Sequence, residues 1–88
     1  MKIKENFVLR QIAGTWAVLP IGDATLDFNG MLTLNESGVL LWQRLEQGCT
    51  REDLVAALLA EYEVTRPVAE VDVDEFLDKL IQAGCLEL

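Results

Sequence analysis

The stretch Gly30-Met31-Leu32-Thr33-Leu34-Asn35-Glu36-Ser37-Gly38 decides the fold, because the hydrophobic period of the chain changes inside it. Residues 31–34 are too few and too apolar for a solvated surface loop, and they predict a short strand. Asn35 suits a helix N-cap, since its side-chain oxygen can accept a hydrogen bond from an unpaired amide of the first turn. The chain shows the period of strands before this stretch and that of helices after it. This single change predicts an α+β domain, with a small sheet packed on a helical part.

Two more strands are predicted before this stretch, over residues 7–12 and 15–20. Gly14 lies between them and can supply the positive φ of a type II turn, or of a type I turn with a G1 bulge, so the two strands form a hairpin. Residues 21–30 are rich in turn residues and predict a loop. The loop residues expected to fold back onto the core are Leu26 and Phe28. With residues 31–34 the predicted antiparallel sheet has three strands.

Three helices are predicted in the second half of the chain. The first spans about residues 36–47. The second starts at Thr50, which forms a capping-box pattern with Asp53. The third runs from about residue 67 to residue 83, and its Pro67 is tolerated because a first-turn amide has no helical partner. The side chains predicted to share one core are Trp16, Leu34, Trp42, Leu58, Val73, Leu77 and Leu80.

Length and composition predict one small domain over residues 1–88. Hydrophobic residues make up 51% of the chain, which excludes the low-hydrophobicity class of disordered proteins. No apolar run approaches the roughly 18 residues of a membrane span, and no signal peptide follows Lys2 and Lys4, so a cytoplasmic protein is expected. The net charge of −8 opposes non-specific attraction to nucleic acid or to a membrane of anionic lipid.

The residue inventory offers no catalytic or metal-binding constellation. The chain has no His, and Cys49 and Cys85 stand far apart with no other soft ligand, so zinc is not expected and both are interpreted as small buried thiols. Ser37 is the only serine and has no His base, so it is interpreted as a first-turn helix residue. No glycine motif for nucleotides occurs, and no cofactor is expected. These absences predict a binding module rather than an enzyme.

An acidic cluster crowds the predicted third helix. Its members are Glu70, Asp72, Asp74, Glu75 and Asp78. We interpret the cluster as a solvated face, because carboxylates near a helix start suit the positive end of the helix dipole. A metal site or an acid–base pair is the sharper alternative, but nothing in the chain pairs these carboxylates with a His.

Several short runs, taken together, resemble the signature of the PqqD family. The earlier runs are Leu34-Asn35-Glu36-Ser37-Gly38, Leu41-Trp42 and Gly48-Cys49-Thr50. The later runs are Glu61-Tyr62-Glu63-Val64, residues 71–80 and Gly84-Cys85-Leu86. The likeness covers about residues 7–86, and the order and spacing of the runs make it specific. Residues 21–29 are longer than the usual turn of the pyrroloquinoline quinone proteins, so the chain resembles a PqqD-like member instead.

The resemblance implies a winged-helix-like domain that acts as a RiPP precursor peptide recognition element. Such domains bind the leader of a ribosomally made peptide and present its core to a modifying enzyme, often a radical SAM enzyme. The leader is expected to add as a strand beside residues 31–34 and to pack against the third helix, on the flank with Phe76 and Lys79 rather than that of Glu70, Asp74 and Ile81. The alternative is that Phe76 lies wholly in the core and Lys79 is merely solvated. The predicted peptide-binding residues are Met31, Leu32, Thr33, Leu34, Asp72, Phe76, Lys79, Leu80 and Ala83.

Two other functional classes stay open at this point. A winged-helix DNA-binding regulator is compatible with the predicted elements, but the basic residues are scattered and an acidic recognition helix would repel phosphates. A small enzyme or metal carrier is disfavoured by the missing His. We therefore expect a peptide and an enzyme as partners, and neither nucleic acid nor a membrane.

Overall fold

The computed structural model describes residues 1–22 and 32–88. Its elements, in chain order, are β1 (Lys2–Ile3), β2 (Phe7–Ile12), β3 (Thr15–Pro20), β4 (Leu32–Leu34), α1 (Glu36–Gln47), α2 (Arg51–Glu61), α3 (Arg66–Ala83) and β5 (Leu86–Glu87). The predicted α+β fold, a three-stranded antiparallel sheet followed by three helices, is confirmed. The predictions made for Leu26, Phe28 and Met31 lie outside the described residues.

The main sheet has the strand order β2-β3-β4, and both pairings are antiparallel. β4 joins β3 through the pairs Trp16↔Leu34 and Val18↔Leu32. Because side chains alternate along a strand, these four lie on one face of the sheet and Thr33 lies on the other. Val18 and Leu34 are 0% and 8% exposed, so this face meets the helices.

The hairpin between β2 and β3 closes with a turn that differs from the predicted types. Ile12 pairs with Thr15, so the loop consists of Ala13 and Gly14, with φ of 51° and 81°. Positive φ at both central positions is typical of a type I′ turn, whose twist matches that of the flanking strands. The predicted type II turn, or type I turn with a bulge, is therefore wrong. Ala13 concealed the turn, because a residue with a Cβ rarely adopts positive φ.

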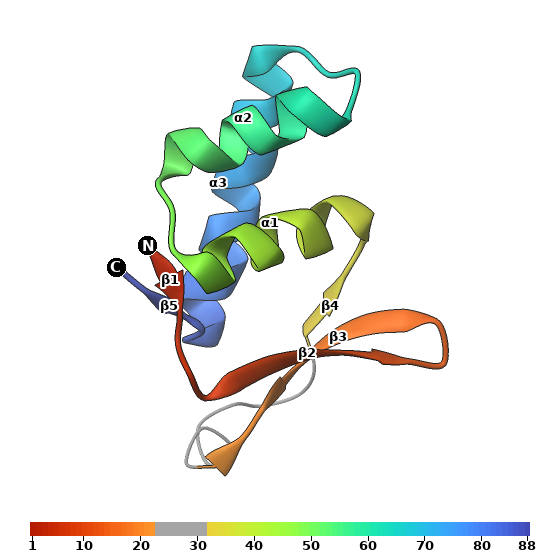
Figure 1. Cartoon of the computed structure of the whole chain (residues 1–88), viewed down its shortest axis with the longest axis vertical. Coiled ribbons are helices and arrows are strands. Elements are labelled where there is room, and N and C mark those ends of the chain that lie inside the picture. The colour runs from red at the N-terminus through yellow and green to blue at the C-terminus, as the bar shows by residue number, and fades with distance from the viewer. Residues whose placement is uncertain (23–31) are drawn as a thin grey trace.

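A second, two-stranded ribbon pairs the beginning of the described chain with its end. Lys2 lies opposite Glu87 and Ile3 opposite Leu86 in β1 and β5, and the amide of Lys4 donates to the carbonyl of Cys85 at 2.9 Å. Figure 1 shows the two ends beside each other at the C-terminal end of α3. Strands of two residues carry no periodic signal, which explains why the sequence did not predict them.

The helices are bounded by the residues that the sequence proposed. The side-chain oxygen of Asn35 accepts the amide of Gly38 at 2.9 Å at the start of α1. The predicted capping box opens α2, with Asp53 N donating to Thr50 Oγ1 at 3.1 Å and Thr50 N to Asp53 Oδ2 at 3.0 Å. Gly84 ends α3 in the left-handed conformation, with φ of 75°. Local capping chemistry therefore fixes where the helical part begins and ends.

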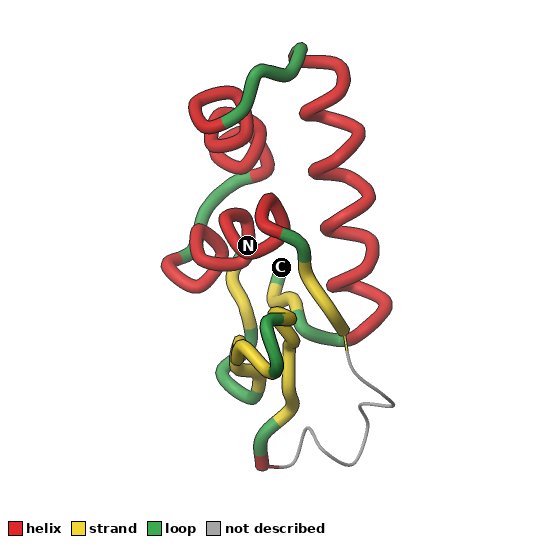
Figure 2. Tube along the Cα trace, turned by 90° about the vertical axis from the view of Figure 1, so that its right-hand side faces the viewer, coloured by secondary structure: helices red, strands yellow, loops and turns green. Residues whose placement is uncertain are grey.

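The core lies where the inner face of the sheet, α1 and the buried stripe of α3 meet. Figure 1 shows α1 crossing α3, and Figure 2 shows α3 along one side of the molecule with α1 and α2 on the other. Six of the seven predicted core side chains are buried: Leu34, Trp42, Leu58, Val73, Leu77 and Leu80. The seventh, Trp16, is half-buried and packs against them.

The two cysteines have different environments. Cys85 is fully buried, and burial raises the pKa of its thiol to about 11, so it stays protonated at neutral pH. Cys49 is half-exposed in the link between α1 and α2, and partial burial is the main cause that raises its pKa. The prediction of a buried thiol thus holds for Cys85 and is wrong for Cys49, which the short link keeps near the surface.

Candidate functional site

The third strand of the sheet, β4, offers an open edge. In the described part of the chain β4 pairs with β3 alone. Thr33 is exposed and Leu32 is half-buried, whereas Leu34 is buried against the core. An edge strand presents unpaired amides and carbonyls, and a peptide in extended conformation can pair with them. β4 leads through Asn35 directly into α1, so this edge ends at the first turn of that helix.

One flank of α3 is already occupied by ion pairs to α2. The guanidinium of Arg51 binds Asp74 with Nε to Oδ1 at 2.7 Å, and it lies 3.7 Å from Glu70. Arg66 pairs with Glu52 and lies 4.0 Å from Glu70. The hydrogen bond from Arg51 is the largest cause that lowers the pKa of the Asp74 carboxyl. The first half of this flank therefore faces α2, and a separate cavity of about 410 Å³ lies further along it, lined in part by Asp74, Leu77 and Ile81.

The opposite flank of α3 borders a cavity of about 180 Å³ between the first half of α1 and α3. Phe76 is 8% exposed, and it lines this cavity beside Leu41 and Leu58. Asp72 and Lys79 lie on the rim of the same cavity. The cavity therefore combines a small apolar floor with a mostly polar border, which also includes Glu75.

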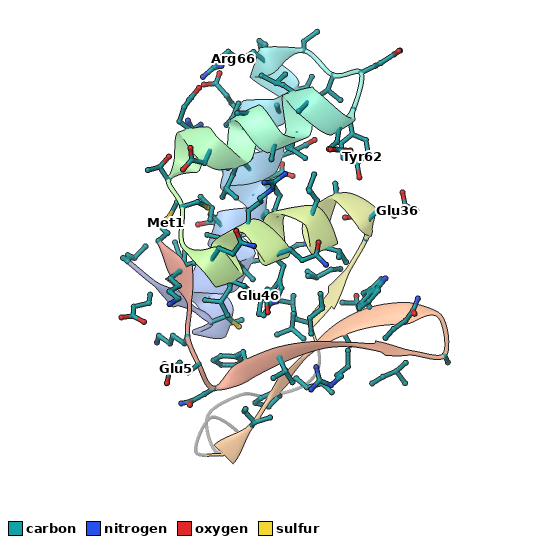
Figure 3. All side chains as sticks on the ribbon, in the orientation of Figure 1. Met1, Glu5, Glu36, Glu46, Tyr62 and Arg66 are labelled. Atoms are coloured by element: carbon teal, nitrogen blue, oxygen red, sulfur yellow. The ribbon has the colours of Figure 1, made fainter. Side chains whose placement is uncertain are left out.

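A second cavity, of about 380 Å³, adjoins the first. The two share Asn35, Ser37, Leu58 and Asp72 as lining residues, so they form one continuous depression, which we call the α1–α3 groove. The lining residues that belong to the second cavity alone are Glu36, Tyr62 and Val64. Figure 3 shows Glu36, at the start of α1, and Tyr62, at the end of α2, on the same side of the molecule.

The predicted site residues fall into three groups. Asp72, Phe76 and Lys79 line the groove. Leu32, Thr33 and Leu34 form β4, while Met31 lies outside the described residues. Leu80 is fully buried, and Ala83 is half-buried near the end of α3; neither lines the groove.

Sequence reasoning missed the part of the groove that α2 and the following segment contribute. Leu58 and Tyr62 belong to the apolar stripe of α2, and such a stripe predicts core packing before it predicts a binding site. Leu58 is indeed 3% exposed, yet it forms the floor shared by both cavities. The only sequence signal was the position of Tyr62 and Val64 at and just beyond the end of a helix, where side chains are free to border a pocket.

The comparisons with known proteins agree with this geometry. The family model described as Coenzyme PQQ synthesis protein D (PqqD) matches residues 15–86, from the start of β3 into β5. The chain belongs to the PqqD family. The predicted resemblance is thereby confirmed. No curated protein matches the chain by sequence.

Two solved structures resemble this member of the PqqD family over almost its whole length. TbiB1 in complex with the TbiA(beta) leader peptide has 32% sequence identity and a TM-score of 0.78, with 99% of this chain and 95% of that chain covered. Lasso peptide synthetase B1 complexed with the leader peptide has 26% identity and a TM-score of 0.74, with 96% and 93% covered. Both similar proteins were therefore solved with a leader peptide bound.

The described residues provide neither a metal-binding cluster nor a membrane-spanning helix. No group of three or more acidic, Cys or His side chains among residues 1–22 and 32–88 is arranged to hold a metal ion. Within the same ranges no helix has both the length and the apolar character needed to cross a membrane. Of the acidic residues of α3, Glu70 and Asp74 face the arginines of α2 and α3, Asp72 and Glu75 line the groove, and Asp78 does neither.

Proposed function

We propose that this PqqD-family chain binds the leader segment of a ribosomally made precursor peptide and acts as a recognition module rather than as an enzyme. The observation that carries the proposal is the open edge of β4 together with the α1–α3 groove, which begins at Asn35 directly after that strand, in a fold that matches two leader-peptide complexes. An edge strand supplies backbone hydrogen bonds, and an adjoining apolar groove supplies side-chain selection. Both elements of β-strand addition are present in this chain.

In the proposed complex the leader pairs with Leu32 and Thr33 and extends the sheet by one strand. Its side chains then face Phe76 and Leu41 in the floor of the first cavity. Lys79 stands at the rim with no ion pair within the described part of the chain, so it is free to meet a carboxylate of the leader. Met31, which precedes β4, would continue the pairing. Leu80 would contribute only indirectly, as a member of the same buried core as Phe76.

We further propose that the bound leader is presented to a peptide-modifying enzyme. The family resemblance favours a radical SAM enzyme, whereas the name of one similar structure favours a peptide synthetase. The neighbouring genes distinguish these two candidate partners. A short peptide gene beside a radical SAM gene supports a radical SAM enzyme as the partner. A DNA-binding role is not favoured, because the net charge is −8 and the arginines of α2 and α3 are engaged by carboxylates.

An NMR titration tests the proposal directly. The probe is a synthetic peptide with the sequence of the N-terminal half of a short peptide encoded beside this chain. We expect amide shifts concentrated in residues 32–34 and 72–83. β2 provides an internal control, because it is the other edge strand of the same sheet and lies away from the groove. Shifts confined to β2, or to the first two helices, would refute the proposed site.

A further inference from the structure

The groove extends beyond the place where β4 ends. β4 passes through Asn35 into α1, and the second cavity lies beyond that point, between the first turn of α1 and the segment after α2. A peptide that pairs with β4 and continues past Asn35 would therefore place a residue beyond its paired segment over Glu36, Tyr62 and Val64. This second cavity is the larger of the two, at about 380 Å³ against about 180 Å³.

The charges around the second cavity are acidic and are not neutralised by the protein. Glu36 and Asp72 line it, and neither is in an ion pair within residues 1–22 and 32–88. This contrasts with the other flank of α3, where Arg51 and Arg66 engage the carboxylates. Lys79, the cation of the groove, lines only the first cavity. The second cavity consequently has an uncompensated negative rim.

The floor of the second cavity is apolar. Leu58 is buried, and Tyr62 and Val64 are half-buried and pack against the core. A purely apolar guest would cover this floor but would also desolvate the two carboxylates without replacing their hydrogen bonds. An acidic guest would be repelled. A long basic side chain suits both the apolar floor and the acidic rim, because its methylene stem covers apolar surface while its charged head reaches the carboxylates.

We propose that the second cavity selects a basic residue, Arg or Lys, of the same leader peptide; this rests on the proposed function. The stem of that residue lies along Leu58 and Val64. Its cationic head is bound by Glu36 and Asp72, and the face of the Tyr62 ring adds a cation–π contact. Backbone pairing at β4 is indifferent to sequence, so this charged anchor would distinguish one leader from another and fix its register on the strand.

The test uses a displayed library of random 15-residue peptides selected on the whole chain. We expect the tightest binders to share one Arg or Lys at a constant spacing from the segment that pairs with β4. Replacing that residue with norleucine should weaken binding about tenfold or more, since a charge-assisted hydrogen bond is lost. Glu36→Gln should produce a similar loss, because it removes a carboxylate that binds the basic side chain. The variant tests the second cavity specifically, since Glu36 does not line the first. In the double variant the two losses should not add.

Asp78→Asn is the matched control. Asp78 is an exposed carboxylate of α3 that lies outside the groove, so its replacement removes one negative charge, as Glu36→Gln does, and should leave binding unchanged. Binders that shift β4 amides but show no basic preference, or an Asp78→Asn effect equal to that of Glu36→Gln, would overturn the charged anchor and leave the proposed function intact. If the library yields no binder at all, the proposed function fails, and this inference fails with it.

Discussion

The guanidinium of Arg51 donates two hydrogen bonds to the carboxylate of Asp74, from Nε to Oδ1 at 2.7 Å and from Nη2 to Oδ2 at 3.0 Å. This parallel pair joins the first turn of α2 to the middle of α3, two segments that are 23 residues apart in sequence. The bidentate geometry needs the planar fork of arginine. It lies on the flank of α3 that faces α2, whereas the opposite flank borders the groove.

Replacement of Arg51 by lysine should therefore lower the melting temperature slightly, even though the charge is kept. The lysine ammonium group cannot form the two parallel hydrogen bonds to Asp74 that the planar guanidinium of arginine forms. The pair is solvent-exposed, so the difference between the variant and the parent should shrink as salt is raised. Thermal unfolding at low and high salt measures this. An equal melting temperature at low salt would show that the second hydrogen bond contributes nothing.

The capping box of α2 predicts a dependence on acid. Hydrogen bonds from the Thr50 backbone and side chain lower the pKa of Asp53 below its ordinary value, which is about 3.9 in unfolded chains. A carboxyl with a lowered pKa in the folded state stabilises the fold above the unfolded pKa, and this contribution is lost as the pH falls through the folded pKa. Asp53→Asn should therefore be less stable than the parent at pH 7.

The two proteins should converge as the pH falls through the lowered pKa of Asp53, because below it both carry a neutral side chain at this position. Urea unfolding across the pH range follows the difference. Asp78→Asn is the control with the same chemical change, because Asp78 is exposed and takes no part in the capping box or in an ion pair within the described residues. A constant difference between Asp53→Asn and the parent at every pH would contradict the assigned role of the carboxylate.

Leu77 and Ile81 test the packing of α3. Leu77 is 8% exposed within the core, whereas Ile81, one turn later, is 50% exposed. Leu77→Ala should lower the free energy of unfolding by roughly 2–5 kcal/mol, because it removes buried methyl groups and leaves a cavity. Ile81→Ala should change it by less than about 0.5 kcal/mol, as surface substitutions usually do. Equal effects would mean that the buried face of α3 is wrongly assigned.

A substitution in the turn between β2 and β3 should make the protein more stable. Ala13 adopts a φ of 51°, a conformation in which a Cβ is crowded by the backbone. Asn tolerates positive φ, and Asn-Gly is favoured in type I′ turns. Ala13→Asn should therefore raise the free energy of unfolding by up to about 1 kcal/mol. Gly14→Ala, at a φ of 81°, should lower it, and a stabilising Gly14→Ala would contradict the turn assignment.

Sequence alone predicted the elements that have strong local signals and missed those held by distant pairing. The caps at Asn35 and Thr50 and the buried stripe of α3 follow from residue chemistry within a few positions. β1 and β5 form only because residues at the two ends of the described chain pair with each other, so no local sequence pattern predicts these strands. The second cavity likewise arises where α1, α2 and α3 converge, and Tyr62 could not be assigned to it before the helices were placed.

Gly38, the last residue of the stretch that decides the fold, lies at a position with little room for a side chain. A Cβ at this position would lie 3.2 Å from the Cβ of Leu34 and 3.2 Å from Oδ1 of Asn35. Neither neighbour can yield easily. Leu34 is held in β4, and Asn35 Oδ1 accepts hydrogen bonds from the amide of Gly38 at 2.9 Å and the hydroxyl of Ser37 at 3.0 Å. The glycine therefore lets β4 and its cap approach the first turn of α1 closely.

Gly38→Ala is accordingly expected to destabilise the protein, although alanine is favoured over glycine by about 1 kcal/mol inside a helix. The added methyl group must push on the cap or on Leu34, and both lie between β4 and α1 beside the groove. Ser37→Ala serves as the comparison, since it removes one hydrogen bond to the cap without adding bulk. Urea unfolding of the three proteins decides the matter. A Gly38→Ala variant more stable than the parent would show that helix propensity outweighs the close approach.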